Sequence, residues 1–194
     1  MTTATPTIPT SADRHEWAGW KAVHRATLCF VIDGERVLLI RKKRGLGAGK
    51  INAPGGKVHG DETPAECAAR ETEEELLVRP QGLEARGRLL FQFTDGYSID
   101  VTVFRAASYE GTPTETEEAI PIWSSFADVP YDEMWKDDEL WLPRFLEGRT
   151  FQGRFIFDDD AMLDHHLEID APLESINALD SHLLPSAELQ PPSN

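Results

Sequence analysis

The sequence has no long apolar run, only two cysteines and few basic residues. No segment approaches the ~18–20 apolar residues that a membrane-spanning helix requires, so we expect no bilayer crossing. The N-terminal residues lack the apolar stretch of a secretory signal, and their acids Asp13 and Glu16 with one arginine argue against a transit peptide. Cys29 and Cys67 have no metal-ligand spacing, and we expect reduced thiols in a cytoplasmic protein.

Basic side chains are scarce compared with acidic ones. Nineteen Lys and Arg residues face 34 Asp and Glu residues, which gives a formal net charge of −15. Such a surface repels DNA, RNA and anionic membranes, because their binding depends on neutralising phosphates with Lys and Arg. We therefore expect no nucleic-acid polymer and no membrane as partner. A phosphate-containing substrate would have to be small and attracted locally or through a cation.

The chain length fits one domain with a sizeable core, flanked by two tails. Residues 1–22 are rich in Thr, Pro and Ala without periodicity, which predicts a flexible extension held by Trp17 and Trp20. Residues 170–194 contain four prolines and scattered acids. They predict a poorly ordered acidic tail with a short helix near residues 173–184. The domain would then span residues 23–169.

Turn signals divide the domain into hairpins. Asp33-Gly34, Asp95-Gly96 and the acidic stretch 158–160 each separate two apolar runs. The expected strands are residues 26–32, 36–40, 89–93, 99–104, 120–124, 151–157 and 162–169. Residues 42–56 hold five glycines and one proline and should be loop. Paired strands with two main helices predict an α+β sandwich.

The two helices have clear start signals. Thr63 and Glu66 form a capping box with Pro64 at the first helical position, and this helix should run through residue 76. The second should begin near Asp137, an N-cap candidate, and stop at Gly148.

The first helix carries three carboxylates beside its apolar side. At about 100° per residue, Glu71, Glu74 and Glu75 form one stripe, and Arg70 can pair with Glu74. The expected buried stripe is Ala65, Ala68, Ala69, Thr72 and Leu76. Like charges at this spacing destabilise a helix by roughly 0.2–0.5 kcal/mol per pair. These residues alone allow a solvated acidic face or a hard-cation site.

The surrounding spacing favours the cation site. Glu62 follows Gly56 by six residues, and Arg70-Glu71 follow Glu62 by eight. With Glu74 and Glu75 this resembles the Nudix box, G-x5-E-x7-R-E-U-x-E-E-x-G-U, at every charged position. Thr72 replaces a usual aliphatic residue. Leu77 replaces the usual glycine, which implies a different helix exit.

Within the Nudix superfamily the chain resembles the mammalian-type MutT homologues, a family of oxidised purine nucleoside triphosphatases. The likeness covers residues 26–169 and is carried by residues 42–50, 101–104, 111–113, 134–138 and 151–153. It implies an α/β/α Nudix sandwich with a mixed β-sheet. It also implies Mg²⁺-dependent hydrolysis, with Mn²⁺ as a substitute, of 8-oxo-dGTP and 2-hydroxy-dATP to monophosphate and pyrophosphate. A monomer acting on a small nucleotide would thereby sanitise the nucleotide pool and prevent DNA damage.

The resemblance implies roles at the phosphate end. The implied metal ligands are Glu71, Glu74, Glu75, the Gly55 carbonyl and Glu118. Glu118 could equally be a solvated loop acid. Arg70 would orient a glutamate, and Glu62 would hold the loop. The general base stays open among Glu74, Glu75 and Glu118. A basic cluster could steer a triphosphate or be solvated surface, and it comprises Lys42, Lys43, Arg44, Lys50 and Lys57.

The resemblance also implies a base pocket. Asn52, Asp137 and Asp138 would hydrogen-bond the purine edge, and Trp135 would stack on the ring. Taken alone, the tryptophan would be core and the aspartate a helix cap. Adjacent buried carboxylates should have split pKa values, so that one stays protonated and donates. Further lining positions are Thr27, Lys42 and Phe91. The family's Met and three aromatic residues are replaced here by Leu46, Ile51, Pro54 and Ile99, so that one stacking aromatic remains.

Two other functions stay open. One is Nudix hydrolysis of another nucleoside diphosphate derivative, such as a methylated purine triphosphate or a dinucleoside polyphosphate. The other is a catalytically silent module that senses a nucleotide, although such modules should have lost the glutamates that this chain keeps.

Overall fold

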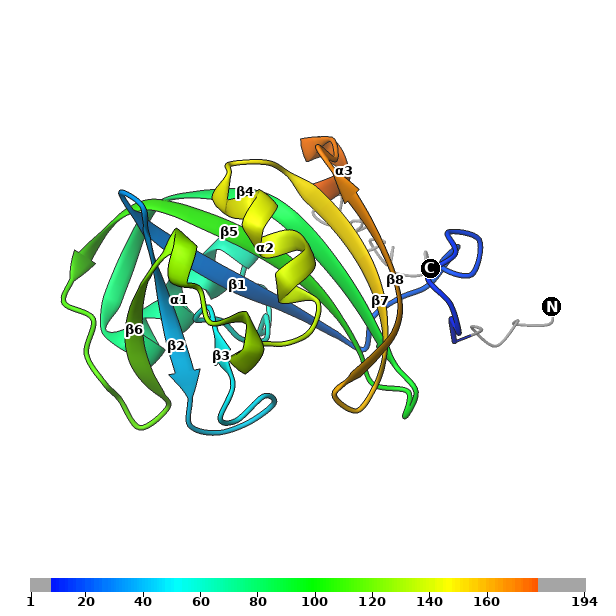
Figure 1. The fold of residues 1–194 in the computed structure, drawn as a ribbon, viewed down its shortest axis with the longest axis horizontal. Helices are drawn as coiled ribbons and strands as arrows, with labels where there is room; N and C mark the ends of the chain where they lie inside the picture. Colours follow the sequence, from blue (N-terminus) through cyan, green and yellow to red (C-terminus); the bar gives the residue numbers. More distant parts are fainter. Residues whose placement is uncertain (1–7, 178–194) are drawn as a thin grey trace, which may run out of the picture.

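The computed structural model describes residues 8–177, in which one curled mixed sheet forms the centre of the molecule (Figure 1). Residues 1–7 and 178–194, including the expected helix beyond residue 177, lie outside the described residues. The strands are β1 (His24–Asp33), β2 (Arg36–Lys42), β3 (Ile51–Asn52), β4 (Val78–Phe93), β5 (Ser98–Gly111), β6 (Ala119–Ser125), β7 (Phe151–Asp158) and β8 (Ala161–Ile169). Their order is β3-β2-β1-β5-β4-β7-β8, and β6 pairs with β2.

The three expected hairpins are confirmed as the antiparallel pairs β1–β2, β4–β5 and β7–β8. Two parallel pairs, β1 with β5 and β4 with β7, join these hairpins into a mixed sheet. The α+β sandwich with a mixed sheet is therefore confirmed.

Two expectations about the strands were wrong. The segment 42–56 is not all loop, because β3 pairs with β2 through Asn52 opposite Ile40. β4 and β5 extend far beyond the expected residues, with a bulge between Ala85 and Gly87. The early half of β4 contains Pro80 and Gly82 among polar and charged residues, so hydrophobic periodicity does not reveal it. Its pairing with β5 supplies the missing stabilisation.

The carboxylate helix α1 (Pro64–Leu76) begins as expected. The Thr63 side chain accepts from the backbone N–H of Glu66, and the Glu66 carboxylate accepts from the N–H of Thr63. The expected buried stripe was partly wrong. Ala65 and Ala69 are only half-buried, while Cys67 and Glu75 are buried. The buried face of α1 therefore includes one of the three carboxylates, that of Glu75.

Leu77 ends α1 in the left-handed conformation, with φ 57° and ψ 32°. The expectation of a different helix exit was wrong, since a glycine would adopt this conformation at the same place. The side chain of Leu77 is exposed, so the chain accepts local backbone strain there without gaining a packed side chain.

The second helix, α2 (Asp138–Leu146), begins and ends close to the predicted residues. Asp137 occupies its N-cap position, and Gly148 follows its end with φ 85°. A short α3 (Leu173–Asn177) packs beside β4. The remaining described helical turns are η1 (Phe126–Asp128) and η2 (Tyr131–Glu133).

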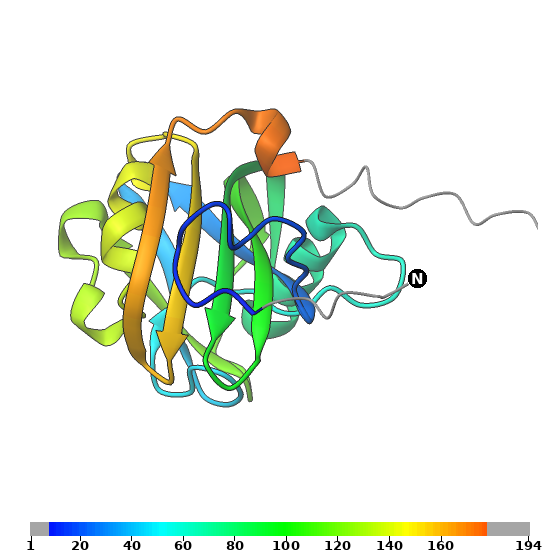
Figure 2. The same cartoon turned by 90° about the vertical axis from the view of Figure 1, so that its right-hand side faces the viewer.

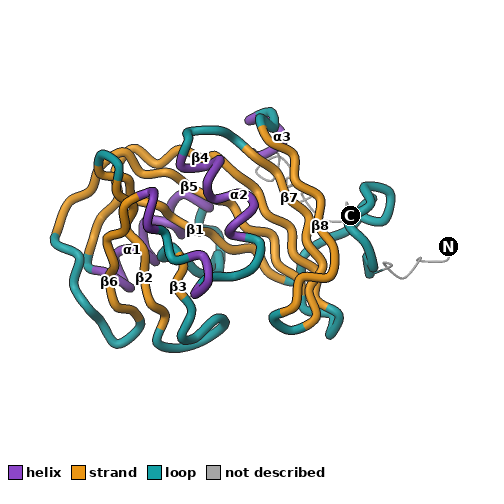
Figure 3. The backbone as a smooth tube through the Cα atoms, viewed as in Figure 1, coloured by secondary structure: helices purple, strands orange, loops and turns teal. Residues whose placement is uncertain are grey.

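The two faces of the sheet are covered by different helices. Figure 1 shows α2 in front of the sheet and α1 behind it, and Figure 3 shows how much of the chain between them is strand. Alternation along β1 sends Phe30 towards α2, and Cys29 and Val31 towards α1. Within residues 8–177, no helix is both long and apolar enough to span a membrane.

Residues 8–22, here called the N-terminal strap, cross the sheet beside β4, β7 and β8 (Figure 2). Trp17 is 8% exposed and lies in a small cluster with Leu90 and Ile156, against which Trp20 packs. The two tryptophans therefore hold the described part of the extension on the sheet.

Candidate active site

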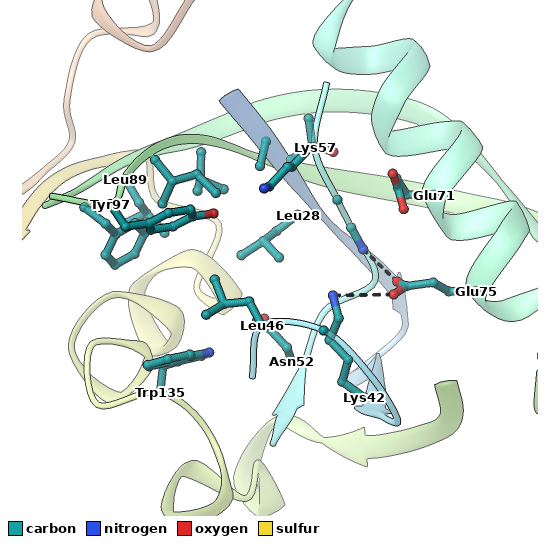
Figure 4. Close-up of a pocket in the computed structure, with 18 of the residues that line it drawn as sticks. Leu28, Lys42, Leu46, Asn52, Lys57, Glu71, Glu75, Leu89, Tyr97 and Trp135 are labelled. Carbon is teal, nitrogen blue, oxygen red and sulfur yellow. Dashed lines mark hydrogen bonds and ion pairs between the residues drawn. The ribbon is translucent and has the colours of Figure 1, made fainter. Parts of the chain in front are cut away.

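A pocket of about 490 Å³ lies between α1, the segment 42–57, the β4–β5 turn and the residues before α2. Figure 4 shows Glu71 and Glu75 on one side, with Trp135 and Tyr97 on the other. All expected substrate residues line this pocket: Thr27, Lys42, Asn52, Phe91, Trp135, Asp137 and Asp138. The structure thus brings residues far apart in sequence to one cavity.

Glu75 is the most enclosed carboxylate of α1, with 2% of its surface exposed. Its Oε2 accepts from the backbone N–H of Gly55 at 2.9 Å, and the amine of Lys42 lies 3.7 Å from its Oε1. Burial raises the pKa of Glu75 to about 7, although Lys42 and the Gly55 N–H favour the ionised form. Glu75 therefore sits where a cation would offset a large desolvation penalty.

Gly55 and Gly56 bring the backbone close to both β1 and α1. The Gly56 carbonyl accepts from the N–H of Thr27 at 2.9 Å. A Cβ on Gly56 would lie 2.3 Å from the carboxyl carbon of Glu71, and one on Gly55 would lie 2.0 Å from the Thr27 carbonyl oxygen. A side chain on Gly55 would clash with backbone, and one on Gly56, the glycine that opens the motif, would displace the Glu71 carboxylate from its present position.

Arg70 connects three glutamates. Its guanidinium donates to Glu62 at 2.7 and 3.0 Å, to Glu71 at 2.8 Å and to Glu74 at 3.0 Å. These bonds from Arg70 lower the pKa of Glu62 to about 2. The contact with Glu74 agrees with the pairing expected from helical spacing. Arg70 and Glu62 thus fix the loop before α1 and the direction of Glu71.

The expected metal ligands do not form one closed cluster. Within residues 8–177, no three His, Cys, Asp or Glu side chains converge in a metal-binding arrangement. Glu71, Glu75 and Glu118 line the pocket, whereas the Glu74 side chain is 54% exposed and lies against Arg70. Glu118 is paired with Arg44. The donor set, carboxylates beside the Gly55 backbone, nevertheless has the oxygen chemistry that hard divalent cations require.

Asp137 and Asp138 are both buried at the opposite end, with 2% and 3% of their surfaces exposed. The Trp141 indole N–H donates to Asp137 at 2.9 Å, and the backbone N–H of Trp135 donates to Asp138 at 3.0 Å. Burial raises the pKa of Asp137 to about 6. Burial and the charge of Asp137 raise that of Asp138 well above its ordinary value. Although Asp137 is at the N-cap, its side chain does not cap the helix.

Trp135 stands between the glycine-rich segment and the sheet. A Cβ on Gly47 would lie 3.1 Å from its indole nitrogen, and the Lys50 amine lies 4.8 Å from its ring. Its ring meets Phe157 edge-on at 5.9 Å. Asn52 points into the same pocket from β3, with its side-chain oxygen bonded to the Ala53 N–H at 2.7 Å. One face of Trp135 is therefore packed, and the pocket lies beside it.

Three aromatic residues of the pocket wall were not predicted from the sequence. Phe93, Tyr97 and Phe157 line the pocket besides the expected Trp135 and Phe91, and the expectation that Trp135 alone stacks on the base stays a prediction. The alternation of Phe91 and Phe93 along β4 could have revealed one of them, since residues i and i+2 share a face. Of the four substituted positions, Leu46 and Ile99 line the pocket, whereas Ile51 and Pro54 do not.

The basic cluster is divided by the fold. Lys42, Arg44 and Lys57 line the pocket. Lys43 pairs with Glu115, and Lys50 pairs with Asp160 at 3.0 Å. Only part of the cluster therefore faces a ligand in the cavity.

The family model of the NUDIX domain matches residues 22–145. The chain belongs to the Nudix family. It is 42% identical over 144 residues to an oxidized purine nucleoside triphosphate hydrolase of Danio rerio, covering 73% of this chain and 92% of the relative. A protein of the same name from Mus musculus is 40% identical over 148 residues, covering 75% and 95%.

The three-dimensional structure of this chain is also similar to that of a solved MutT protein. The mutator MutT protein from Bacillus halodurans superposes with a TM-score of 0.69 at 27% identity. The match covers 77% of this chain and all of that one. As a Nudix hydrolase, the chain belongs to a family whose members generally use a divalent metal ion. Most of the strap, residues 8–21, precedes the matched Nudix domain.

Proposed function

We propose that this Nudix hydrolase cleaves oxidised purine nucleoside triphosphates, 8-oxo-dGTP and also 2-hydroxy-dATP, to the monophosphate and pyrophosphate. The observation that carries the proposal is a single pocket with Glu71 and Glu75 at one end and the buried Asp137–Asp138 pair at the other. One end suits a metal-bound phosphate chain, and the other suits a purine edge. The names of the two relatives at 40% and 42% identity support the same reaction.

At the phosphate end, water adds to a phosphorus atom and the α–β bridging P–O bond breaks, which releases pyrophosphate. Mg²⁺, or Mn²⁺ in its place, would supply Lewis acidity and lower the pKa of bound water. The residues proposed to hold it are Glu71, Glu74, Glu75, Glu118 and the Gly55 carbonyl. Glu74, Glu75 and Glu118 are the candidate acceptors for the water proton. Arg70 keeps Glu71 directed towards the pocket through its bond at 2.8 Å.

At the base end, the two aspartates offer different hydrogen-bonding states. Their raised pKa values favour a protonated carboxyl on one of them near neutral pH, so the pair has both a donor and acceptors. An oxidised purine differs from the normal base in the donors and acceptors along its edge. Asp137, Asp138 and Asn52 would match that edge while Trp135 stacks on the ring. Thr27 and Phe91 would complete the wall, as the pocket lining supports.

The charges of the pocket suit a small anion. Lys42, Arg44 and Lys57 are local cations in a chain of net charge −15. They would attract a triphosphate, whereas the overall charge disfavours a nucleic-acid polymer or an anionic membrane. We propose a cytoplasmic monomer, a setting with which the free, buried thiols of Cys29 and Cys67 agree.

A substrate panel tests the proposal. Turnover of 8-oxo-dGTP, 2-hydroxy-dATP, O6-methyl-dGTP, dGTP and a dinucleoside polyphosphate would be followed with Mg²⁺, with the products identified by chromatography. We expect the two oxidised nucleotides to be used best and to yield monophosphate and pyrophosphate. Faster turnover of O6-methyl-dGTP or of the dinucleoside polyphosphate would instead identify a methylated purine triphosphate or a dinucleoside polyphosphate as the substrate. No turnover of any compound would favour a nucleotide-sensing module.

A further inference from the structure

The N-terminal strap is anchored to the outer side of the sheet at two places. At one end, the N–H of Ala12 donates to Asp164 on β8 at 2.8 Å, and Arg154 on β7 donates to the Ala12 carbonyl at 3.1 Å. At the other end, the rings of Trp17 and Trp20 meet at 4.7 Å over the sheet. These contacts hold the strap in a fixed position relative to β4.

Trp20 reaches a buried side chain of β4. Its indole N–H donates at 2.8 Å to the side-chain oxygen of Gln92, a residue 3% exposed. The Gln92 amide then donates to the carbonyls of Phe93 at 2.9 Å and Tyr97 at 3.1 Å. The side-chain oxygen of Gln92 therefore accepts a hydrogen bond from the strap, and its amide group donates two hydrogen bonds to the β4–β5 turn.

The same turn places two aromatic rings in the pocket. Phe93 and Tyr97 pack edge-on at 5.6 Å, and both line the cavity from the inner side of the turn. The ring of Tyr97 also meets His24, the first residue of β1, at 5.2 Å. Just before His24, the Val23 N–H donates to Ser98 at 3.0 Å, so the chain leaving the strap holds the residue after Tyr97 as well.

Tyr97 faces the nucleoside end of the cavity. Figure 4 shows its ring on the side away from Glu71 and Glu75, with the hydroxyl directed into the pocket. Trp135 lies on the same side, lower in that view. A nucleotide with its phosphates at α1 and its base at Trp135 would bring its base or sugar beside Tyr97. Contact there would change substrate binding more than the chemical step.

We infer that Tyr97 is a specificity-determining residue that contacts the nucleoside, and that Trp20 and Gln92 are positioning residues that hold it from the other side of the sheet. The inference rests on the proposed function for the identity of the nucleoside. It gives the strap, most of which lies outside the matched Nudix domain, a part in substrate selection.

The test uses three variants of the full chain and one control. Trp20→Phe removes the indole donor to Gln92 while keeping an aromatic ring, and Gln92→Leu removes the link to the turn. Tyr97→Leu removes the aromatic wall. The control is Trp17→Phe, which alters the same strap cluster but has no bond to Gln92. Binding of 8-oxo-dGMP in EDTA, KM and kcat for 8-oxo-dGTP, and melting temperature would be measured for each.

We expect Trp20→Phe and Gln92→Leu to weaken 8-oxo-dGMP binding and raise KM by about three- to tenfold, the range for one lost hydrogen bond, with kcat within about twofold. Trp17→Phe should change KM by less than about twofold, because it keeps an aromatic ring in the cluster and leaves the Trp20–Gln92 bond in place, although loss of its own bond to the Ser11 carbonyl should lower the melting temperature. In the Tyr97→Leu background, Trp20→Phe should add nothing, because the two residues act through one contact.

Three results would overturn the inference. The first is wild-type KM and 8-oxo-dGMP binding in Trp20→Phe and Gln92→Leu. The second is additive effects of Trp20→Phe and Tyr97→Leu. The third is a loss of binding that follows melting temperature equally in Trp20→Phe and Trp17→Phe. If the wild-type chain does not turn over 8-oxo-dGTP, the proposed function itself fails. The same binding series with the nucleotide preferred in the substrate panel would then decide the positioning inference separately.

Discussion

The amine of Lys42 lies 3.7 Å from the carboxylate of Glu75, which is almost fully buried on α1. The two residues come from different elements, β2 and α1, and the Gly55 N–H donates to the second carboxylate oxygen. A buried anion of this kind is stabilised only if positive charge or donors surround it. Lys42 and the Gly55 N–H therefore stabilise a negative charge on Glu75 at the end of the pocket where we propose that the phosphates bind.

Glu75→Gln should lower turnover by at least ~10²-fold while the fold survives, because metal stabilisation of the transition state is worth several kcal/mol. The amide oxygen can still accept from the Gly55 N–H, while the substitution removes the negative charge and the second acceptor oxygen, which faces Lys42. Glu74→Gln should have a comparable effect, and EDTA should abolish activity reversibly. The control is Glu73→Gln, an exposed residue paired with Arg79. Wild-type turnover with an intact metal requirement would remove the mutated residue from the ligand set.

Asp138→Asn should reduce kcat/KM for 8-oxo-dGTP by about tenfold or more, because a mismatched buried donor or acceptor costs about 1–3 kcal/mol. The ranking of 8-oxo-dGTP against 2-hydroxy-dATP should also change. Glu74→Gln should instead depress all substrates together. Steady-state kinetics on the three proteins checks this. Equal losses on every substrate in Asp138→Asn would contradict base reading by the acidic pair.

The acidic pair also predicts a pH-dependent stability. Folding raises the pKa of Asp137 from 3.8 to about 6, and that of Asp138 is raised further from 3.8. Between about pH 4 and the folded pKa values, the folded chain therefore binds protons that the unfolded chain has released. The free energy of unfolding should fall as pH rises through this range, because burial then requires a charged carboxylate or a bound proton. The melting temperature of Asp138→Asn relative to wild type should be higher at pH 8 than at pH 5. A difference that stays constant between these pH values would show that Asp138 is not buried as an acid.

Several features of the site follow directly from the sequence. The capping box at Thr63 and the glutamate spacing define α1 and place Glu71 and Glu75 together. The pairing of Glu74 with Arg70 also follows from the helical spacing. What the sequence does not contain is which motif carboxylates line the cavity: Glu71 and Glu75 do, whereas the Glu74 side chain is 54% exposed.

The missed elements have their own physical reasons. β3 is two residues long within a glycine-rich segment, too short for any periodic signal. The contribution of Tyr97 depends on the curl of the β4–β5 hairpin, and that of the strap depends on contacts with β7 and β8, more than a hundred residues away. Such long-range packing fixes residues 8–22 on the sheet, whereas their composition predicts a flexible chain held by Trp17 and Trp20.

Leu77 offers a test of local strain. Leu77→Gly should stabilise the protein by about 0.5–1 kcal/mol, since the left-handed conformation costs a non-glycine residue roughly 1–2 kcal/mol and glycine loses part of this gain in chain entropy. The Leu77 side chain is 57% exposed, so little packing is lost. Glu73→Gly, at an exposed site inside α1, should destabilise by about 1 kcal/mol. Thermal or urea unfolding compares them, and destabilisation by both would refute the strain at residue 77.

The most direct test of the central claim is the ratio of kcat/KM for 8-oxo-dGTP to that for unmodified dGTP, measured on the wild-type chain with Mg²⁺. The two nucleotides share the triphosphate and the sugar, so the ratio measures discrimination between the two bases alone. We propose that this discrimination comes from the end of the pocket that contains Asn52, Asp137, Asp138 and Trp135. We predict a ratio of at least about ten, the discrimination expected from one well-matched buried hydrogen bond. A ratio near one would contradict the account: the Nudix site would stand, but its base end would not read oxidised purines.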